Sequence, residues 1–166
     1  MPFSYRPLRL DDAPLVWDIY SEPTVQQQAV LHVEEMQADS IEPMLRRWLT
    51  DGRQYHYLVT DESGIPLGLN QLFAVDRIAR TAESGILLLP HARGRGAAAQ
   101  IHEHQLFVAR ELLGLNRLTA QVAAYNTHSL HIMQKLGFQQ DGVRRRALYR
   151  GDEFHDIFLF SKSVPA

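Results

Sequence analysis

The pattern of apolar and polar positions begins with a short strand and an amphipathic helix. Residues 3–10 have a strand-like composition and end at a pair of aspartates. Either Asp11 or Asp12 can accept hydrogen bonds from the first free amides of a helix, and Pro14 suits its first turn. Pro23 predicts the end of this helix. The buried face of the helix is expected to hold Leu15, Trp17, Ile19 and Tyr20.

A second helix is followed by a change of period that predicts three strands. Apolar residues recur at helical spacing over residues 34–50, where Pro43 could divide the helix in two. Residues 55–60 and 67–75 read as strands on either side of a polar turn, which is typical of a β-hairpin. Residues 82–89 end in an uninterrupted apolar run. Such a run predicts a central strand that is buried on both faces.

The C-terminal half alternates between helices and strands. A helix is expected over residues 97–113, followed by a strand over 117–124 and a short helix over 126–136. Two last strands, 142–149 and 154–161, are joined by a glycine-aspartate turn. The predicted order is therefore strand, two helices, three strands, helix, strand, helix, two strands. The longer helix is expected to bury Ile101, Val108, Ala109 and Leu112.

Length and composition predict one domain of a mixed α/β class. No repeat or linker-like tract divides residues 1–166, and this length is typical of a single domain. The absence of cysteine excludes disulfide bonds, thiolate metal sites and a cysteine nucleophile, and it suits a reducing compartment. A net charge of −2 argues against a nucleic-acid partner. We also recognise neither a membrane-spanning run nor a signal peptide, and therefore expect a cytoplasmic protein with no membrane partner.

Two polar clusters are interpreted as surface features. Among the eight histidines, His128 and His131 could share a helical face, but no carboxylate completes a ligand set, so no metal is expected. Arg144, Arg145 and Arg146 would alternate between the two faces of a strand. This alternation favours a solvated edge, or the edge of a homodimer, over a phosphate-binding patch.

The turn after the apolar strand has the composition of a phosphate-binding loop. Residues 93–98 read RGRGAA and lie between a strand and a helix, where free backbone amides and the helix dipole attract anions. The spacing excludes a Walker A loop. A dinucleotide fingerprint is formally matched by Gly94, Gly96 and Ala99, but the loop lies outside a first βαβ unit and lacks the acidic residue of that motif. A plain glycine-rich turn is the simplest alternative.

The same loop resembles the R/Q-x-x-G-x-G/A motif of the GCN5-related N-acetyltransferases (GNAT), which binds the pyrophosphate of acetyl-CoA. Arg93, Gly96 and Ala98 match this motif position by position. Residues 82–90 also resemble the fourth strand of that family.

Further matches follow along the chain. Residues 126–129 read NTHS and residues 135–138 read KLGF, which together resemble the family's helix-to-strand segment N-x-x-A/S…K-L-G-F. Residues 151–156 read GDEFHD and resemble the RimJ/RimL-like branch. The matches lie in the right order and cover about half of the chain.

This resemblance implies an α/β (α+β) fold whose mixed central sheet is splayed between its fourth and fifth strands, with helices on both faces. Residues 82–89 and 117–124 would be the splayed strands, and acetyl-CoA would bind between them as co-substrate. The backbone of the fourth strand would pair with pantetheine, and the loop amides would hold the pyrophosphate. The implied cofactor-binding residues are Ile86, Leu87, Leu88, Arg93, Gly94, Arg95, Gly96, Ala97, Ala98, Asn126, Ser129 and Lys135.

The resemblance also implies direct transfer of an acetyl group from acetyl-CoA to a primary amine. The attacking amine must be neutral, and Glu83 is the expected general base, with a solvated hairpin residue as the alternative reading. Many relatives place a tyrosine, which protonates the leaving thiolate, where this chain has Met133. Ser129 is the first candidate to replace that tyrosine, ahead of Tyr125 or a water molecule. Glu83 and Ser129 are thus the expected catalytic residues.

Two segments are expected to contact the acceptor, residues 22–39 and the hairpin 146–155. Both segments are fairly acidic, which favours a cationic amine, and Tyr149 and His155 are candidate contacts. The RimJ/RimL-like resemblance suggests a protein N-terminus instead, and other relatives acetylate polyamines, amino sugars and antibiotics. The missing tyrosine keeps a non-catalytic acetyl-CoA-binding sensor open as an alternative.

Overall fold

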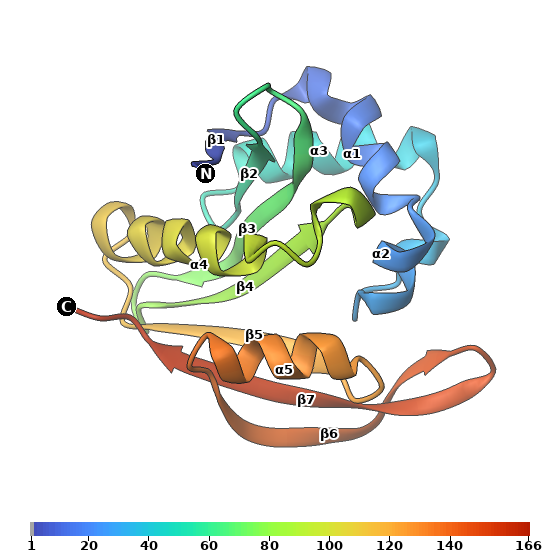
Figure 1. The fold of residues 1–166 in the computed structure, drawn as a ribbon, viewed down its shortest axis with the longest axis vertical. Coiled ribbons are helices and arrows are strands. Elements are labelled where there is room, and N and C mark those ends of the chain that lie inside the picture. The colour runs from blue at the N-terminus through green and yellow to red at the C-terminus, as the bar shows by residue number, and fades with distance from the viewer. Residues whose placement is uncertain (1) are drawn as a thin grey trace.

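The computed structural model describes residues 2–166, which form a seven-stranded mixed sheet. The strands lie in the order β1-β2-β3-β4-β5-β7-β6 (Figure 1). Neighbouring strands are antiparallel, except β4 and β5, which are parallel. In chain order the strands are β1 (Ser4–Pro7), β2 (Tyr55–Thr60), β3 (Pro66–Asp76), β4 (Thr81–Leu88), β5 (Arg117–Ala123), β6 (Gln139–Arg150) and β7 (Glu153–Ser163).

Helices connect these strands in the predicted order, except that α2 adds a third helix between β1 and β2. The α-helices within residues 2–166 are α1 (Ala13–Tyr20), α2 (Pro23–Gln28), α3 (Ile41–Thr50), α4 (Ala97–Phe107) and α5 (Thr127–Lys135). Short 3₁₀ turns lie at Leu10–Asp12, Val33–Glu35, Ala38–Ser40 and Pro90–Ala92, and a π-helical turn at Val108–Leu112 extends α4. No helix in this part of the chain is long and apolar enough to cross a lipid bilayer.

The helices cover both faces of the sheet, as expected. Leu58 and Val59 are consecutive residues of β2 and therefore point to opposite faces. Leu58 belongs to the cluster of buried residues that contains Ile19 of α1 and Leu45 of α3. Val59 packs in a second cluster with Ile101 of α4. Since α5 lies along β5 beside α4 (Figure 1), α4 and α5 share one face and α1 and α3 share the other.

The sheet is splayed between β4 and β5, which confirms the expected geometry. The two strands pair only from Thr81 with Arg117 to Glu83 with Thr119. Beyond that point β4 continues to Leu88 and β5 to Ala123 without pairing to each other (Figure 1). The apolar run of β4 is consequently half-buried rather than buried on both faces. The prediction of a fully buried strand is wrong because the run lines an opening in the sheet.

Gly68 allows β3 to approach β4 at the far end of that opening. It pairs with Leu88 and has φ of 156°, a value that side-chain-bearing residues rarely adopt. A Cβ atom at this position would lie 1.8 Å from the carbonyl oxygen of Leu87. Any larger residue would therefore push the backbone of β4 away from β3.

Two prolines act differently from the sequence-based prediction. Pro23 does not simply end a helix, because it begins α2, whose first amides donate to the carboxylate of Glu22. Pro43 is the third residue of α3 and does not divide it, since an amide in the first turn has no intrahelical partner to lose. The N-terminal part of the predicted helix 34–50 instead forms two separate 3₁₀ turns.

Some predicted core positions also differ. Ile19 and Tyr20 are buried as expected, whereas Leu15 and Trp17 are half-buried. Leu112 is 58% exposed, because the π-helical turn rotates the end of the helix away from the straight apolar face. The remaining predicted strands and helices are found within a few residues of their expected bounds.

Candidate active site

A cavity of about 190 Å³ opens where β4 and β5 diverge. Its walls come from both halves of the splayed sheet, from α4 and α5, and from the chain around the end of α2. The lining residues from the sheet are Phe73, Glu83, Ser84, Gly85, Ile86, Leu87, Leu88, Ala120, Gln121 and Val122. Those from the helices and turns include Val25, Gln28, Ala29, Val30, Leu31, Arg93, Ala98, His102, Gln105, Asn126, His128, Ser129, Ile132 and Met133.

The turn before α4 has the geometry of an anion site. Gly94 and Gly96 both have positive φ, of 78° and 68°, and α4 begins directly afterwards at Ala97. The amides of residues 94–96 donate to no backbone carbonyl within residues 2–166, and the first amides of α4 are free because they open a helix. These free amides and the positive end of the helix dipole fit the pyrophosphate of acetyl-CoA.

Arg93 is anchored rather than free in this turn. Its Nε and Nη2 atoms donate to the carbonyl oxygen of Leu88 at 3.2 and 2.9 Å. Partial burial would raise the pKa of Glu22, but hydrogen bonds from Thr24 and Val25 and the nearby charge of Arg93 lower it. Arg93 is therefore fixed to the end of β4, with its charge near the start of α2.

The cavity brings together only some of the residues that are predicted to bind the cofactor. Ile86, Leu87, Leu88, Arg93, Ala98, Asn126 and Ser129 line the cavity. The rest, Gly94, Arg95, Gly96, Ala97 and Lys135, are not among its lining residues, and all of them except Ala97 are exposed.

Asn126 is buried and caps α5. Its Oδ1 atom accepts a hydrogen bond from the amide of Ser129 at 3.1 Å. This contact fixes the orientation of the side chain and leaves the two Nδ2 hydrogens for a ligand. The Ser129 hydroxyl has no hydrogen-bond partner within residues 2–166, and Met133, one turn later, is half-buried against the same cavity.

Glu83 occupies the last paired position of β4, at the apex of the opening. Its Oε1 atom accepts a hydrogen bond from Nε2 of Gln121 at 2.9 Å. The Oε1 atom of Gln121 accepts in turn from Nη1 of Arg144 at 3.2 Å. Because a guanidinium group can only donate, Arg144 determines which end of the Gln121 amide faces Glu83. Glu83 is therefore half-buried and oriented in the cavity rather than solvated at a hairpin.

Glu83 faces the side of the sheet opposite α4 and α5. Gln121, which binds it, pairs directly with Leu159 of β7 and shares a face with it. Leu159 packs on the buried cluster that also contacts Val30. The chain after α2 thus lies on the face of Glu83, while the glycine-rich turn before α4 and Asn126 belong to the other side.

A buried polar network that no sequence motif indicates begins in the wall of the cavity, at His102 and Gln105 of α4. His102 Nδ1 lies 3.0 Å from Gln105 Oε1, and Gln105 Nε2 donates to the carbonyl of Gly85. On its other side His102 Nε2 lies 3.0 Å from Nζ of Lys162, which donates to the carbonyl of Leu136. Burial is the main cause that lowers the pKa values of His102 and Lys162. In the sequence, His102 and Gln105 lie three residues apart on the apolar face of the helix predicted over residues 97–113. Two polar residues on such a face are the one local sign of this network.

The acidic residues of the two predicted acceptor segments lie outside the cavity. Of the carboxylates that made residues 22–39 and 146–155 acidic, none lines the cavity, whereas Glu83 does. Glu22 caps α2 and Glu34 pairs with Arg150. The first segment does reach the cavity through Val25 and residues 28–31, but the hairpin contributes no lining residue. The first segment therefore lines the cavity, the hairpin does not, and contact of either segment with the acceptor stays a prediction.

Comparisons with known proteins agree with this geometry. Residues 3–139 match the family model described as an acetyltransferase (GNAT) domain. A spermidine N(1)-acetyltransferase of Vibrio cholerae is 24% identical over 119 residues, covering 72% of this chain and 69% of that protein. A putative ribosomal N-acetyltransferase of Bacillus subtilis is 29% identical over 114 residues, covering 66% and 62%.

A solved structure shows the same fold. The crystal structure of spermidine N-acetyltransferase from Vibrio cholerae in complex with CoA and spermine aligns with a TM-score of 0.91, at 19% identity, over 98% of this chain and 95% of that one. The family model covers most of the chain, including the divergent strands and the turn before α4. This chain therefore belongs to the GNAT acetyltransferase family.

Proposed function

We propose that the protein transfers the acetyl group of acetyl-CoA to the primary amine of a small cationic molecule. The observation that carries the proposal is the cavity between β4 and β5, which has an anion-binding turn on one side of the sheet and an oriented carboxylate on the other. In the reaction a C–N bond forms between the amine and the acetyl carbon, the C–S bond breaks, and CoA leaves as a thiolate. Starting from the ammonium form, the nitrogen loses two protons, one before it attacks and one as the amide forms. One proton ends on the thiolate, and the other is released to solvent.

Glu83 is the proposed base. A bound ammonium group cannot attack until it has lost a proton, and a carboxylate that is held in place can accept that proton directly or through a water molecule. The hydrogen bond from Gln121 keeps Glu83 at the apex of the cavity, where the two strands diverge. A backbone amide near Leu87 or Leu88 is proposed to stabilise the oxyanion that forms on the acetyl group.

Ser129 is the proposed proton donor to the leaving thiolate. It lines the cavity at the start of α5, and its hydroxyl has no partner within the part of the chain that the structure describes. Tyr125, the other hydroxyl considered, donates to the carbonyl of Gln27 instead. A thiol leaving group with a pKa near 8.5 makes only a modest demand on such a donor.

The shape of the lining supports a small aliphatic amine as the acceptor. On the face of Glu83 the wall is formed by Ala29, Val30 and Leu31, which favour the methylene groups of an alkyl chain. Glu83 would attract the positive charge of its terminal nitrogen. The names of the spermidine acetyltransferase relatives fit this substrate class, while a protein N-terminus is the competing acceptor.

Further parts of the proposal concern the setting of the protein. We expect one domain that acts in the cytoplasm, since a chain without cysteine has no need of an oxidising compartment. A homodimer through the exposed edge strand β6 stays a prediction, as does the absence of nucleic-acid partners.

Release of free thiol from acetyl-CoA tests the function. The purified protein is incubated with acetyl-CoA and, in parallel, spermidine, a short alkyl diamine, an amino sugar and a peptide with a free N-terminus. We expect thiol release with the first two, and none without an amine. Turnover of the peptide alone would replace the small amine by a protein N-terminus. Protection by CoA in a thermal-shift assay without turnover of any amine would favour a non-catalytic sensor, and protection by NAD but not CoA would favour a dinucleotide site.

A further inference from the structure

Arg150 binds several backbone carbonyls of residues 27–34, a segment that forms part of the cavity wall. Arg150 is the last residue of β6, and its side chain is only 14% exposed. Its Nη1 atom donates to the carbonyl oxygens of Gln27, at 3.1 Å, and Ala29. Its Nη2 atom donates to the carbonyl of Leu31 at 3.2 Å and to the carboxylate of Glu34 at 3.0 Å. A single guanidinium group thus binds four acceptors along residues 27–34.

Neighbouring aromatic residues hold Arg150 in this position. Nη1 also donates to the hydroxyl of Tyr125 at 3.1 Å, and that hydroxyl donates to the same Gln27 carbonyl. The ring of His155 meets the ring of Tyr125 edge-on, with centroids 4.7 Å apart. Nε2 of His155 lies 2.9 Å from the backbone carbonyl of Arg150. The planar, five-donor geometry of arginine suits this arrangement, and a lysine could not reproduce it.

Residues 27–31 have few other polar attachments. Apart from the bonds inside α2, their remaining backbone hydrogen bonds are local, from the amide of Ala29 to Val25 and from the amide of Val33 to Leu31. Within residues 2–166, every hydrogen bond that joins 27–31 to a distant part of the chain comes from Arg150 or Tyr125. Arg150 binds the carbonyl oxygens of residues 27, 29 and 31, and residues 28–31 line the cavity.

We propose that Arg150 is a positioning residue that holds residues 27–34 as the acceptor-side wall of the cavity. The inference rests on the proposed acetyl transfer to an amine, because it assigns this wall to the amine. The hairpin of β6 and β7 reaches the same side of the molecule as the chain after α2 (Figure 1). The hairpin therefore acts on the acceptor through Arg150 without lining the cavity. The residues proposed for acetyl-CoA lie on β4, in the turn before α4, and in α5 with its N-cap. Within residues 2–166, Arg150 donates no hydrogen bond to any of them.

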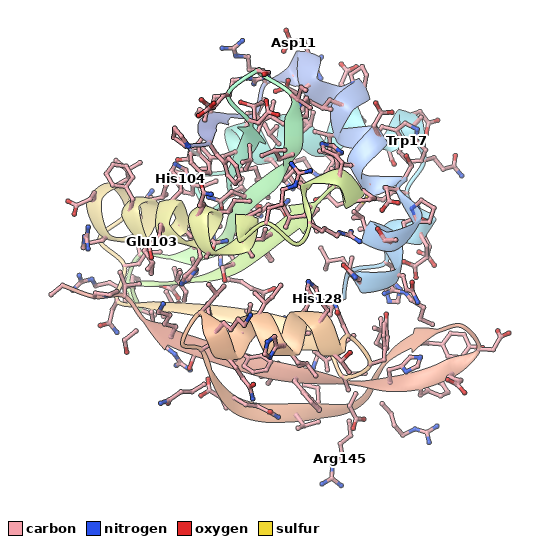
Figure 2. The ribbon with its side chains drawn as sticks, in the orientation of Figure 1. Asp11, Trp17, Glu103, His104, His128 and Arg145 are labelled. Carbon is pink, nitrogen blue, oxygen red and sulfur yellow. The ribbon has the colours of Figure 1, made fainter. Side chains whose placement is uncertain are left out.

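The test compares Arg150→Met and Arg150→Lys with Arg145→Met. Arg145 is an exposed residue of the same strand whose side chain points away from the molecule (Figure 2) and makes no hydrogen bond within residues 2–166. We expect both Arg150 variants to raise the KM of the acceptor amine about tenfold or more, while the KM of acetyl-CoA changes less than about twofold. Amide hydrogen exchange in residues 27–34 should become faster in the same variants. Arg145→Met should change none of these values.

Tyr125→Phe serves as a milder variant, because it removes one hydroxyl and keeps the ring against His155. It should shift acceptor KM and local exchange in the same direction by a smaller factor. An unchanged acceptor KM despite faster exchange would overturn the proposal, as would an equal rise in both KM values. If the wild type acetylates no amine, the proposed function fails. Exchange in residues 27–34 still reports in that case whether Arg150 holds the segment.

Discussion

The role proposed for Glu83 depends on neighbours that are distant in the sequence. The carboxylate is oriented by Gln121, and Gln121 is oriented by Arg144. Arg144 thus has a defined contact rather than a purely solvated position, which refines the sequence-based reading of residues 144–146. A carboxylate held by one amide keeps its second oxygen free for the proton of an incoming amine.

Replacing Glu83 by glutamine should lower kcat about 100-fold or more, because a positioned general base typically contributes at least this much. A glutamine amide cannot accept the proton of the amine. Initial rates of thiol release across a pH series provide the measurement. Glu62→Gln, at an exposed turn residue, is the matched control and should behave as the wild type. A Glu83→Gln profile that superimposes on the wild type would remove Glu83 from the mechanism.

The sequence predicts the position of some cavity residues but not of others. Glu83, Asn126 and Ser129 were named from motif positions, and the structure brings all three to one cavity. Gln121 and Arg150 belong to no motif, and their roles depend on contacts across strands or with a segment more than 100 residues away. No local pattern encodes such contacts.

At the scale of elements, the site depends on how β3, β4 and β5 are spaced. The parallel pairing stops after Glu83, and β4 keeps its antiparallel pairing with β3 up to Leu88. The backbone of β4 is therefore held from one side and open on the other, which is the side that we assign to pantetheine. Gly68 sets the distance between β3 and β4 at the end of this open stretch.

Gly68→Ala should destabilise the protein by about 3 kcal/mol and raise the KM of acetyl-CoA. The added Cβ would meet backbone atoms of β4, which cannot move aside like a flexible side chain. Urea denaturation and acetyl-CoA kinetics give the two measurements. Gly64→Ala is the control, because Gly64 also has positive φ but its Cβ would meet nothing within 4 Å. Equal losses in the two variants would show that backbone conformation, not the close approach, determines the effect.

The observed helices and strands agree with the predicted ones where the pattern of apolar and polar residues extends over a long segment. The hairpin of β2 and β3, the helix after the glycine-rich turn and the capped helix α5 lie close to their predicted bounds. The prediction failed for the apolar run of β4, because apolar composition does not distinguish a strand covered by protein from one that lines a cavity. It also failed at Pro23, where a proline that can end one helix begins the next.

At the scale of the whole molecule, buried histidines couple stability to pH. His56 is buried in β2, with its ring stacked 3.7 Å from that of Trp48. Its Nε2 atom lies 2.8 Å from Gln54 Oε1, and its Nδ1 atom accepts from Gln71 Nε2, an arrangement that suits the neutral ring. Burial lowers the pKa of His56 to about 3.

The sign of the effect follows from the two protonation states. Below a pH of about 6.5 the unfolded chain binds a proton at His56 that the folded protein resists, so stability falls with decreasing pH towards about 3. Between about pH 7 and pH 5, this residue should reduce the free energy of unfolding by about 2 kcal/mol. His56→Gln should remove that part of the pH dependence in urea denaturation, whereas His131→Gln, at an exposed histidine, should keep it. An unchanged slope in His56→Gln would contradict the assignment.

The sequence by itself determined most of the order of the elements, the glycine-rich turn before α4 and the family. Each of these depends on residues that are neighbours in the chain, such as those of a helix start, a glycine pair or an alternating strand. The tertiary structure decided which of these parts meet. It placed Glu83 at the apex of the splayed strands, directed the acidic residues of the acceptor segments away from the cavity, and connected the C-terminal hairpin to residues 27–34 through Arg150. Those outcomes depend on hydrogen bonds between residues far apart in the chain, where local patterns carry no information about distance.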